Sequence, residues 1–171
     1  DMFSTSFEDT NGPLRLPPKT PVESAGLDIT SVCFKDEGGT VLPFPLSGKP
    51  ALVSVRCLAH RPMTEINLVV AVSNLSIESE RVLYLSSQYD RQPMSVETGE
   101  VELQLDLPYC GLSAGLYSAK IVVTEQNVKT LDAVESFRFR VNSDGLTEQN
   151  LFYQPRKWRA LNKSVAFTEK G

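Results

Sequence analysis

The chain has 171 residues, about the size of one ordinary domain, and 41% of them are hydrophobic, which is enough to fill one core. Its formal net charge of −4 provides no broad attraction to nucleic acid or to anionic lipid. The apolar runs are short and interrupted by charge, so no membrane-spanning helix is expected, and residues 1–20 hold no apolar signal-peptide core.

Residues 1–24 are predicted to be a semi-rigid linker. They carry four prolines, Pro13, Pro17, Pro18 and Pro21, among polar residues. This composition disfavours a helix and packs poorly. The chain opens with Asp1 and not with an initiator methionine, so we interpret it as a piece of a longer protein.

From Gly26 onward the sequence is typical of strands. Residues 27–34 are rich in β-branched side chains and end in a Gly-containing turn. Residues 41–46 contain two prolines, so we expect an edge strand or a loop there. In residues 51–59, Ala51, Val53 and Val55 alternate with polar or larger residues, which predicts one buried face.

The later segments repeat this pattern. The further predicted strands are residues 66–73, 81–86, 101–107, 116–124 and 134–141, with polar loops at 87–99 and 125–132. Short strands without a long amphipathic helix predict an all-β fold, namely a two-sheet antiparallel sandwich of the immunoglobulin-like or jelly-roll-like kind. Tyr117 follows a turn-like segment, which suits either a tyrosine corner or an ordinary core tyrosine.

After residue 145 an aromatic-rich segment follows that has no place in this pattern, so we predict that it lies outside the sandwich. It contains Leu151, Phe152, Tyr153 and Trp158. Such side chains are costly to leave in water, so the segment either packs back on its own sandwich or docks on a second copy. The predicted organisation is therefore a sandwich at 25–145 and a C-terminal strand and tail at 146–171, possible elements of a strand-exchanged dimer.

Cysteine and histidine usage argues against a metal site. Cys33, Cys57 and Cys110 are widely spaced, and His60 is the single histidine. We expect buried free thiols, as in a reducing compartment, and no metal.

The sequence carries no catalytic motif, so we expect neither enzymatic activity nor a cofactor. Acidic pairs such as Glu100 and Glu102 fall at positions predicted to face solvent, where a solvated surface is the simpler interpretation. A small hydrolase is kept as a remote alternative.

Polar and aromatic residues at outward or loop positions favour ligand binding on a sheet face. Sugars are recognised by stacking on aromatic rings and by planar hydrogen-bonding groups. The candidate glycan-binding residues are Arg56, His60, Tyr84, Gln88, Lys120, Arg138 and Arg140. An ordinary charged surface is the alternative interpretation of the arginines and Lys120.

The order of several short segments resembles a known family. These are residues 27–32, the turn at 36–39, Ser47-Gly48-Lys49-Pro50, Arg61-Pro62, the 112–118 corner and the closing Ser136–Val141. Together they resemble the C-terminal carbohydrate-binding domain of Wzt-type ATP-binding subunits of O-antigen ABC transporters. The resemblance extends over about Leu27 to Asn142.

This resemblance implies a dimeric β-sandwich, with the C-terminal strand exchanged in some members. It implies non-catalytic binding of the non-reducing end of an O-antigen polysaccharide at the cytoplasmic face of the inner membrane. The implied partners are the polysaccharide, a second copy, the transmembrane subunit and an upstream ATPase domain, and no nucleic acid. The alternative is a protein-interaction or dimerisation sandwich that does not bind sugar.

Overall fold

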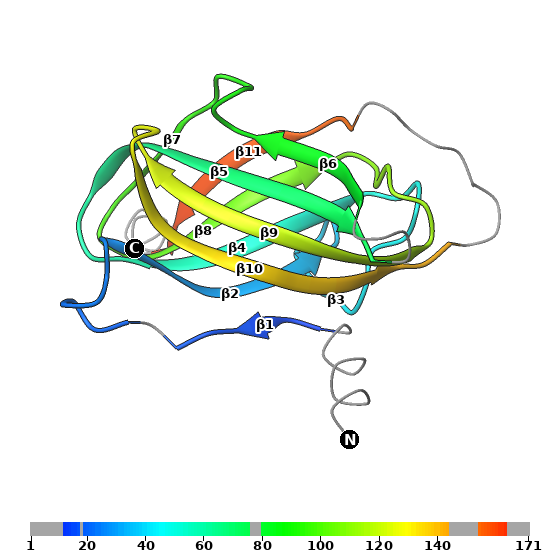
Figure 1. Ribbon diagram of the computed structural model, residues 1–171, viewed down its shortest axis with the longest axis horizontal. Helices are drawn as coiled ribbons and strands as arrows, with labels where there is room; N and C mark the ends of the chain where they lie inside the picture. Colours follow the sequence, from blue (N-terminus) through cyan, green and yellow to red (C-terminus); the bar gives the residue numbers. More distant parts are fainter. Residues whose placement is uncertain (1–11, 18, 76–79, 144–153, 164–171) are drawn as a thin grey trace.

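The computed structural model describes residues 12–17, 19–75, 80–143 and 154–163, and they form two antiparallel sheets packed face to face (Figure 1). The first sheet has the order β1-β2-β4-β8-β11, with β3 also on β2, and comprises β1 (Leu14–Arg15), β2 (Leu27–Lys35), β3 (Val41–Leu42), β4 (Ala51–Ala59), β8 (Gly99–Leu107) and β11 (Lys157–Asn162). The second has the order β10-β9-β5-β6, with β7 also on β5, and comprises β5 (Met63–Asn74), β6 (Glu80–Ser86), β7 (Met94–Val96), β9 (Gly115–Glu125) and β10 (Lys129–Val141). The predicted two-sheet sandwich is confirmed.

The alternation within the strands builds the core. Val55 on β4 pairs with Leu103 on β8, and both are fully buried. Leu68 on β5 and Ile121 on β9 are fully buried in the facing sheet. A cavity of about 30 Å³ remains between the sheets, lined mainly by apolar side chains. This is about the volume of one water molecule, so the interior has no room for a sugar.

Tyr117 forms a tyrosine corner, which was one of the two alternatives predicted for it beside an ordinary core tyrosine. Its ring is buried and stacks on Phe139, with 5.6 Å between ring centroids. Its hydroxyl donates a hydrogen bond to the carbonyl of Ser113 in the preceding turn, at 2.7 Å. The bond ties the entry of β9 to the loop that precedes it.

Two loops differ from the prediction. The segment 87–99, expected to be a loop throughout, contains β7, because Met94 and Val96 pair with β5 and bury their side chains. The loop expected at 125–132 is a tight turn: Gln126 and Asn127 have φ of 53° and 60°, as in a type I′ hairpin turn. Sequence polarity therefore overstated the length of both loops.

The prediction that Trp158 lies outside the sandwich is wrong. In the single chain β11 pairs with β8, and Trp158 is buried in the core opposite Leu105. Leu151, Phe152 and Tyr153 lie outside the described residues. The predicted linker also contains structure, since β1 pairs with Ser31 and Val32 of β2.

Within the described ranges, no helix is long and apolar enough to cross a membrane.

Candidate functional site

A groove of about 300 Å³ lies on the outer face of the second sheet. Its lining comes from β5, β6 and β9 and from the loops that follow β6 and β9. The lining residues are Val69, Ala71, Arg81, Tyr84, Gln88, Lys120, Val122, Thr124 and Asn127. We refer to the small side chains Val69, Ala71 and Val122 as the groove floor and to the longer polar and aromatic side chains as its walls.

A β-bulge in β6 brings Arg81 and Tyr84 to the same face. Strict alternation would place residues three apart on opposite faces. Here Tyr84 pairs with Ala71, whereas Arg81 pairs with Ser73, because the register shifts by one residue between them. Since Ala71 and Ser73 share a face, their partners share it too.

Aromatic and cationic groups meet at this wall. The Arg81 guanidinium lies over the Tyr84 ring, 5.3 Å from the centroid, which is within cation–π range. The Tyr84 and Tyr89 rings are tilted by 38° with centroids 5.8 Å apart. Both tyrosines are exposed, at 43% and 70%. The wall therefore offers aromatic surface and donors to a ligand.

A buried chain of hydrogen bonds fixes the two loops relative to the groove floor. The Ser87 hydroxyl donates to the Asn67 side-chain oxygen at 2.9 Å, and the Asn67 amide donates to the Asn127 oxygen at 2.8 Å. Ser87 and Asn67 are both buried. The β6–β7 loop and the β9–β10 turn are thus held to the same residue of β5.

The charge of the lining favours an anionic ligand group. Arg81 and Lys120 are its charged members, and none of the described residues that line it carries a carboxylate. Lys120 lies 3.5 Å from Glu135, but both side chains are exposed, so solvent screens this pair. A locally positive groove in a chain of net charge −4 suits a phosphate or carboxylate.

Three of the candidate glycan-binding residues meet in this groove: Tyr84, Gln88 and Lys120. Arg138 and Arg140 extend from the same outer face but on β10, opposite Ser118 and Leu116, and do not line the groove.

Arg56 lies instead on the outer face of the first sheet. It lines a different groove of about 410 Å³, and its guanidinium is 3.6 Å from Glu100. None of the described residues that line this groove is aromatic, so they offer a sugar less stacking surface than the groove at Tyr84.

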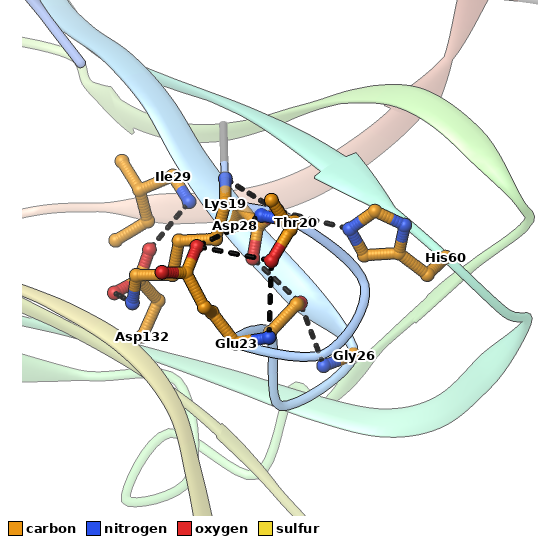
Figure 2. A network of polar contacts seen from close by, with 9 residues as sticks. Lys19, Thr20, Glu23, Gly26, Asp28, Ile29, His60 and Asp132 are labelled. Carbon is orange, nitrogen blue, oxygen red and sulfur yellow. Dashed lines mark hydrogen bonds and ion pairs between the residues drawn. The ribbon is translucent and has the colours of Figure 1, made fainter. Parts of the chain in front are cut away.

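His60 belongs to a polar network at the end of β4 (Figure 2). Its Nε2 is 2.9 Å from Oδ2 of Asp28, which also accepts hydrogen bonds from the Ser24 hydroxyl and the Lys19 amide. Burial acts to raise the pKa of Asp28, but the bonds from Ser24 and His60 outweigh it and lower that pKa below its usual value. The geometry assigns His60 a partner within its own chain.

Asp132 extends this network from the second sheet. Its carboxylate accepts bonds from Lys19 Nζ at 2.9 Å and from the Ile29 amide at 2.8 Å (Figure 2). The segment that enters β2 is thus fixed to both sheets.

Glu102, predicted to face solvent, is buried, and that prediction is wrong. It accepts a bond from Lys35 Nζ at 2.8 Å and another from the Ser54 hydroxyl. Burial alone would raise its pKa, but these two bonds lower it. No group of three or more potential metal ligands occurs among the residues described.

Sequence reasoning missed Arg81 and Asn127 as groove residues. The Arg81-x-x-Tyr84 spacing contradicts strand alternation and would have needed the bulge to be foreseen. Asn127 was missed because the loop at 125–132 was predicted to be longer than the tight turn that Gln126 and Asn127 form.

No family model and no curated protein sequence matches the chain. Among solved structures, the crystal structure of the C-terminal domain of Wzt matches with a TM-score of 0.58 and 14% identity, over 81% of this chain and 87% of that chain. At this identity the similarity establishes the fold. The chain is therefore a β-sandwich similar in fold to the C-terminal domain of Wzt, as its sequence segments suggested.

Proposed function

We propose that this chain is a non-catalytic carbohydrate-binding domain whose groove at Tyr84, Gln88 and Lys120 holds the non-reducing end of an O-antigen polysaccharide. The observation that carries the proposal is the groove itself, which combines positive charge with an aromatic ring and has no carboxylate among its described lining residues. It occurs on the fold of the Wzt C-terminal domain.

The groove chemistry suits a sugar with an anionic substituent. Tyrosine rings pack against the apolar face of a pyranose, and side-chain amides such as those of Gln88 and Asn127 bond its hydroxyls. Arg81 and Lys120 pair with a phosphate or carboxylate at the end of the chain. Arg138 and Arg140 lie where further sugar units would pass.

The remaining roles follow from the likeness to Wzt and rest on it. The domain belongs to the ATP-binding subunit of an ABC transporter, with the ATPase activity in a separate upstream domain. It acts at the cytoplasmic face of the inner membrane beside the transmembrane subunit, where glycan recognition is coupled to export. No nucleic acid is a partner.

A homodimer is part of the proposal. Exchange of β11 between two copies would keep its pairing with β8. Leu151, Phe152 and Tyr153 stay proposed dimer residues on the basis of their sequence. Light scattering of the full chain and of a chain ending at residue 145 tests this. A dimer that survives the truncation would contradict the exchange.

The test of binding uses purified bacterial O polysaccharides ending in phosphate or in a uronic acid, each with its terminal group intact and then removed. Calorimetric titration is expected to show binding only with the end intact. Equal affinity for both forms would refute recognition of the terminus, and no binding to any of them would refute the function.

A protein-interaction sandwich is the second candidate. The edge strand β6 exposes Val82 at 41% and Tyr84 at 43%, a surface that another chain could cover. If this candidate is correct, Tyr84→Ala changes the oligomeric state, and neither the wild type nor the variant binds the polysaccharide.

A further inference from the structure

The loop between β6 and β7 forms a tight turn that carries Gln88, which lines the groove, and Tyr89, whose ring lies beside that of Tyr84. Within it the Gln92 amide donates to the Ser87 carbonyl at 2.8 Å, and the Asp90 amide donates to the Ser86 carbonyl at 3.1 Å. Arg91 has φ of 57°, a left-handed conformation that costs a non-glycine residue about 1–2 kcal/mol. Such a conformation persists where the surroundings hold it.

The surroundings that hold it come from Arg156, which directly precedes β11, and from Trp158 on β11. Arg156 donates two parallel hydrogen bonds to Asp90, from Nε at 2.8 Å and from Nη2 at 2.7 Å. The Trp158 indole N–H donates to the same carboxylate at 2.7 Å. The Asp90 and Arg156 side chains are 18% and 23% exposed, so solvent screens the pair less than an open surface pair.

This contact joins the C-terminal strand to the groove. Asp90 follows Gln88 and Tyr89 directly, whereas Arg156 is 66 residues further along the chain. The base of the loop is fixed separately through Ser87 to Asn67. The loop therefore has two supports, one from β5 and one from the C-terminal strand.

We infer that Arg156 and Trp158, acting through Asp90, are positioning residues that set the affinity of the groove by holding Gln88 and Tyr89 in place. The inference rests on the proposed function and adds a means of control to it. When β11 is seated, the loop stays in the binding conformation. When the contact is lost, the loop samples several conformations. The apparent affinity then falls in proportion to the fraction of molecules whose loop is in the binding conformation.

The first experiment needs no ligand. Hydrogen exchange of the Tyr89, Asp90 and Gln92 amides is compared in wild type, Arg156→Gln and Asp90→Asn. We expect about tenfold faster exchange in both variants, because the loop opens more often. Unchanged exchange would overturn the inference whatever the sugar results.

Arg159→Gln, on β11 itself, is the matched control. Arg159 donates to Gln104 at 3.1 Å and lies 3.6 Å from Asp106, so it contacts β8 and not the loop. Its exchange rates in residues 89–92 are expected to equal those of wild type. Accelerated exchange there would show a general effect of perturbing β11 and would count against a specific role of Arg156.

The second experiment titrates the phosphate-ended O polysaccharide. Arg156→Gln and Asp90→Asn are expected to bind about tenfold more weakly, with Arg159→Gln at wild-type affinity and Arg156→Lys partly restored. Trp158→Phe keeps an aromatic ring in the core and removes one hydrogen-bond donor to Asp90, so we expect an intermediate loss of affinity. This variant tests the inference even if the charge variants fold poorly.

The outcomes separate the two proposals. Wild-type affinity in Arg156→Gln and Trp158→Phe would refute the positioning role and leave the function intact. Failure of wild type to bind either the phosphate-ended or the uronic-acid-ended polysaccharide would refute the function, and the positioning role with it.

Discussion

His60 Nε2 lies 2.9 Å from Oδ2 of Asp28, whose side chain is 1% exposed. The same carboxylate accepts hydrogen bonds from the Ser24 hydroxyl and the Lys19 amide (Figure 2). One buried aspartate therefore connects the segment that enters β2 to the end of β4. A charge buried to this degree is tolerated because its oxygens are occupied by donors. Removing the Asp28 charge should therefore lower the stability of the fold and have little direct effect on ligand binding.

We expect Asp28→Asn to lower the free energy of unfolding by about 1–3 kcal/mol at neutral pH. The pKa of Asp28 is lowered in the folded state, so its carboxylate contributes stability above its ordinary pKa and loses that contribution as pH falls through the folded value. The stability gap between variant and wild type should narrow from pH 7 to about pH 3 in urea unfolding. Glu37→Gln, at an exposed turn position, is the control, and a gap that widens on acidification would contradict the assignment.

Removing the Tyr117 hydroxyl tests the tyrosine corner. Tyr117→Phe keeps the stack on Phe139 but loses the bond to the Ser113 carbonyl, so we expect a loss of about 1 kcal/mol in unfolding free energy. Tyr89→Phe removes a hydroxyl from a side chain that is 70% exposed and should change stability by less than about 0.5 kcal/mol. Equal losses of unfolding free energy in the two variants would show that the hydrogen bond from Tyr117 to Ser113 does not stabilise the fold.

Alanine variants on the two sheets test which face binds. Tyr84→Ala is expected to weaken binding of the phosphate-ended polysaccharide about tenfold, or ~1.4 kcal/mol, with little change in Tm because the ring is exposed. Arg138→Ala and Arg140→Ala, outside the groove on the same face, should cause smaller losses of affinity, also without a change in Tm. Arg56→Ala on the opposite sheet should bind as wild type; a loss confined to Arg56→Ala would place the site on the first sheet.

The three cysteines provide a check on the core. Cys33, Cys57 and Cys110 are buried free thiols, and burial raises the pKa of each. A disulfide reagent that needs the thiolate should not react with the native protein and should titrate three thiols in denaturant. Rapid labelling of a thiol under native conditions would mean that the sandwich opens there.

Strand alternation carried most of the fold prediction. The buried face of residues 51–59 was assigned correctly because the period-two pattern depends on neighbours one or two residues apart. The same pattern failed to predict the burial of Glu102, which depends on its contacts with Lys35 and Ser54 on other strands. The candidate site was predicted in part: Tyr84, Gln88 and Lys120 meet in one groove. Arg56 and His60 also face outward, but alternation does not say which of the two sheets a strand joins.

Local pattern and turn chemistry in this sequence were sufficient for the two-sheet sandwich and the buried thiols, whereas the structure decided between a tyrosine corner and a plain core residue at Tyr117. The tertiary structure decided that Trp158 is a core residue, that Arg81 shares a face with Tyr84, and that Arg156 contacts the loop that carries Tyr89. These relationships depend on which strands become neighbours and on a register shift. Both are set by the packing of the whole sandwich, which no short stretch of sequence encodes.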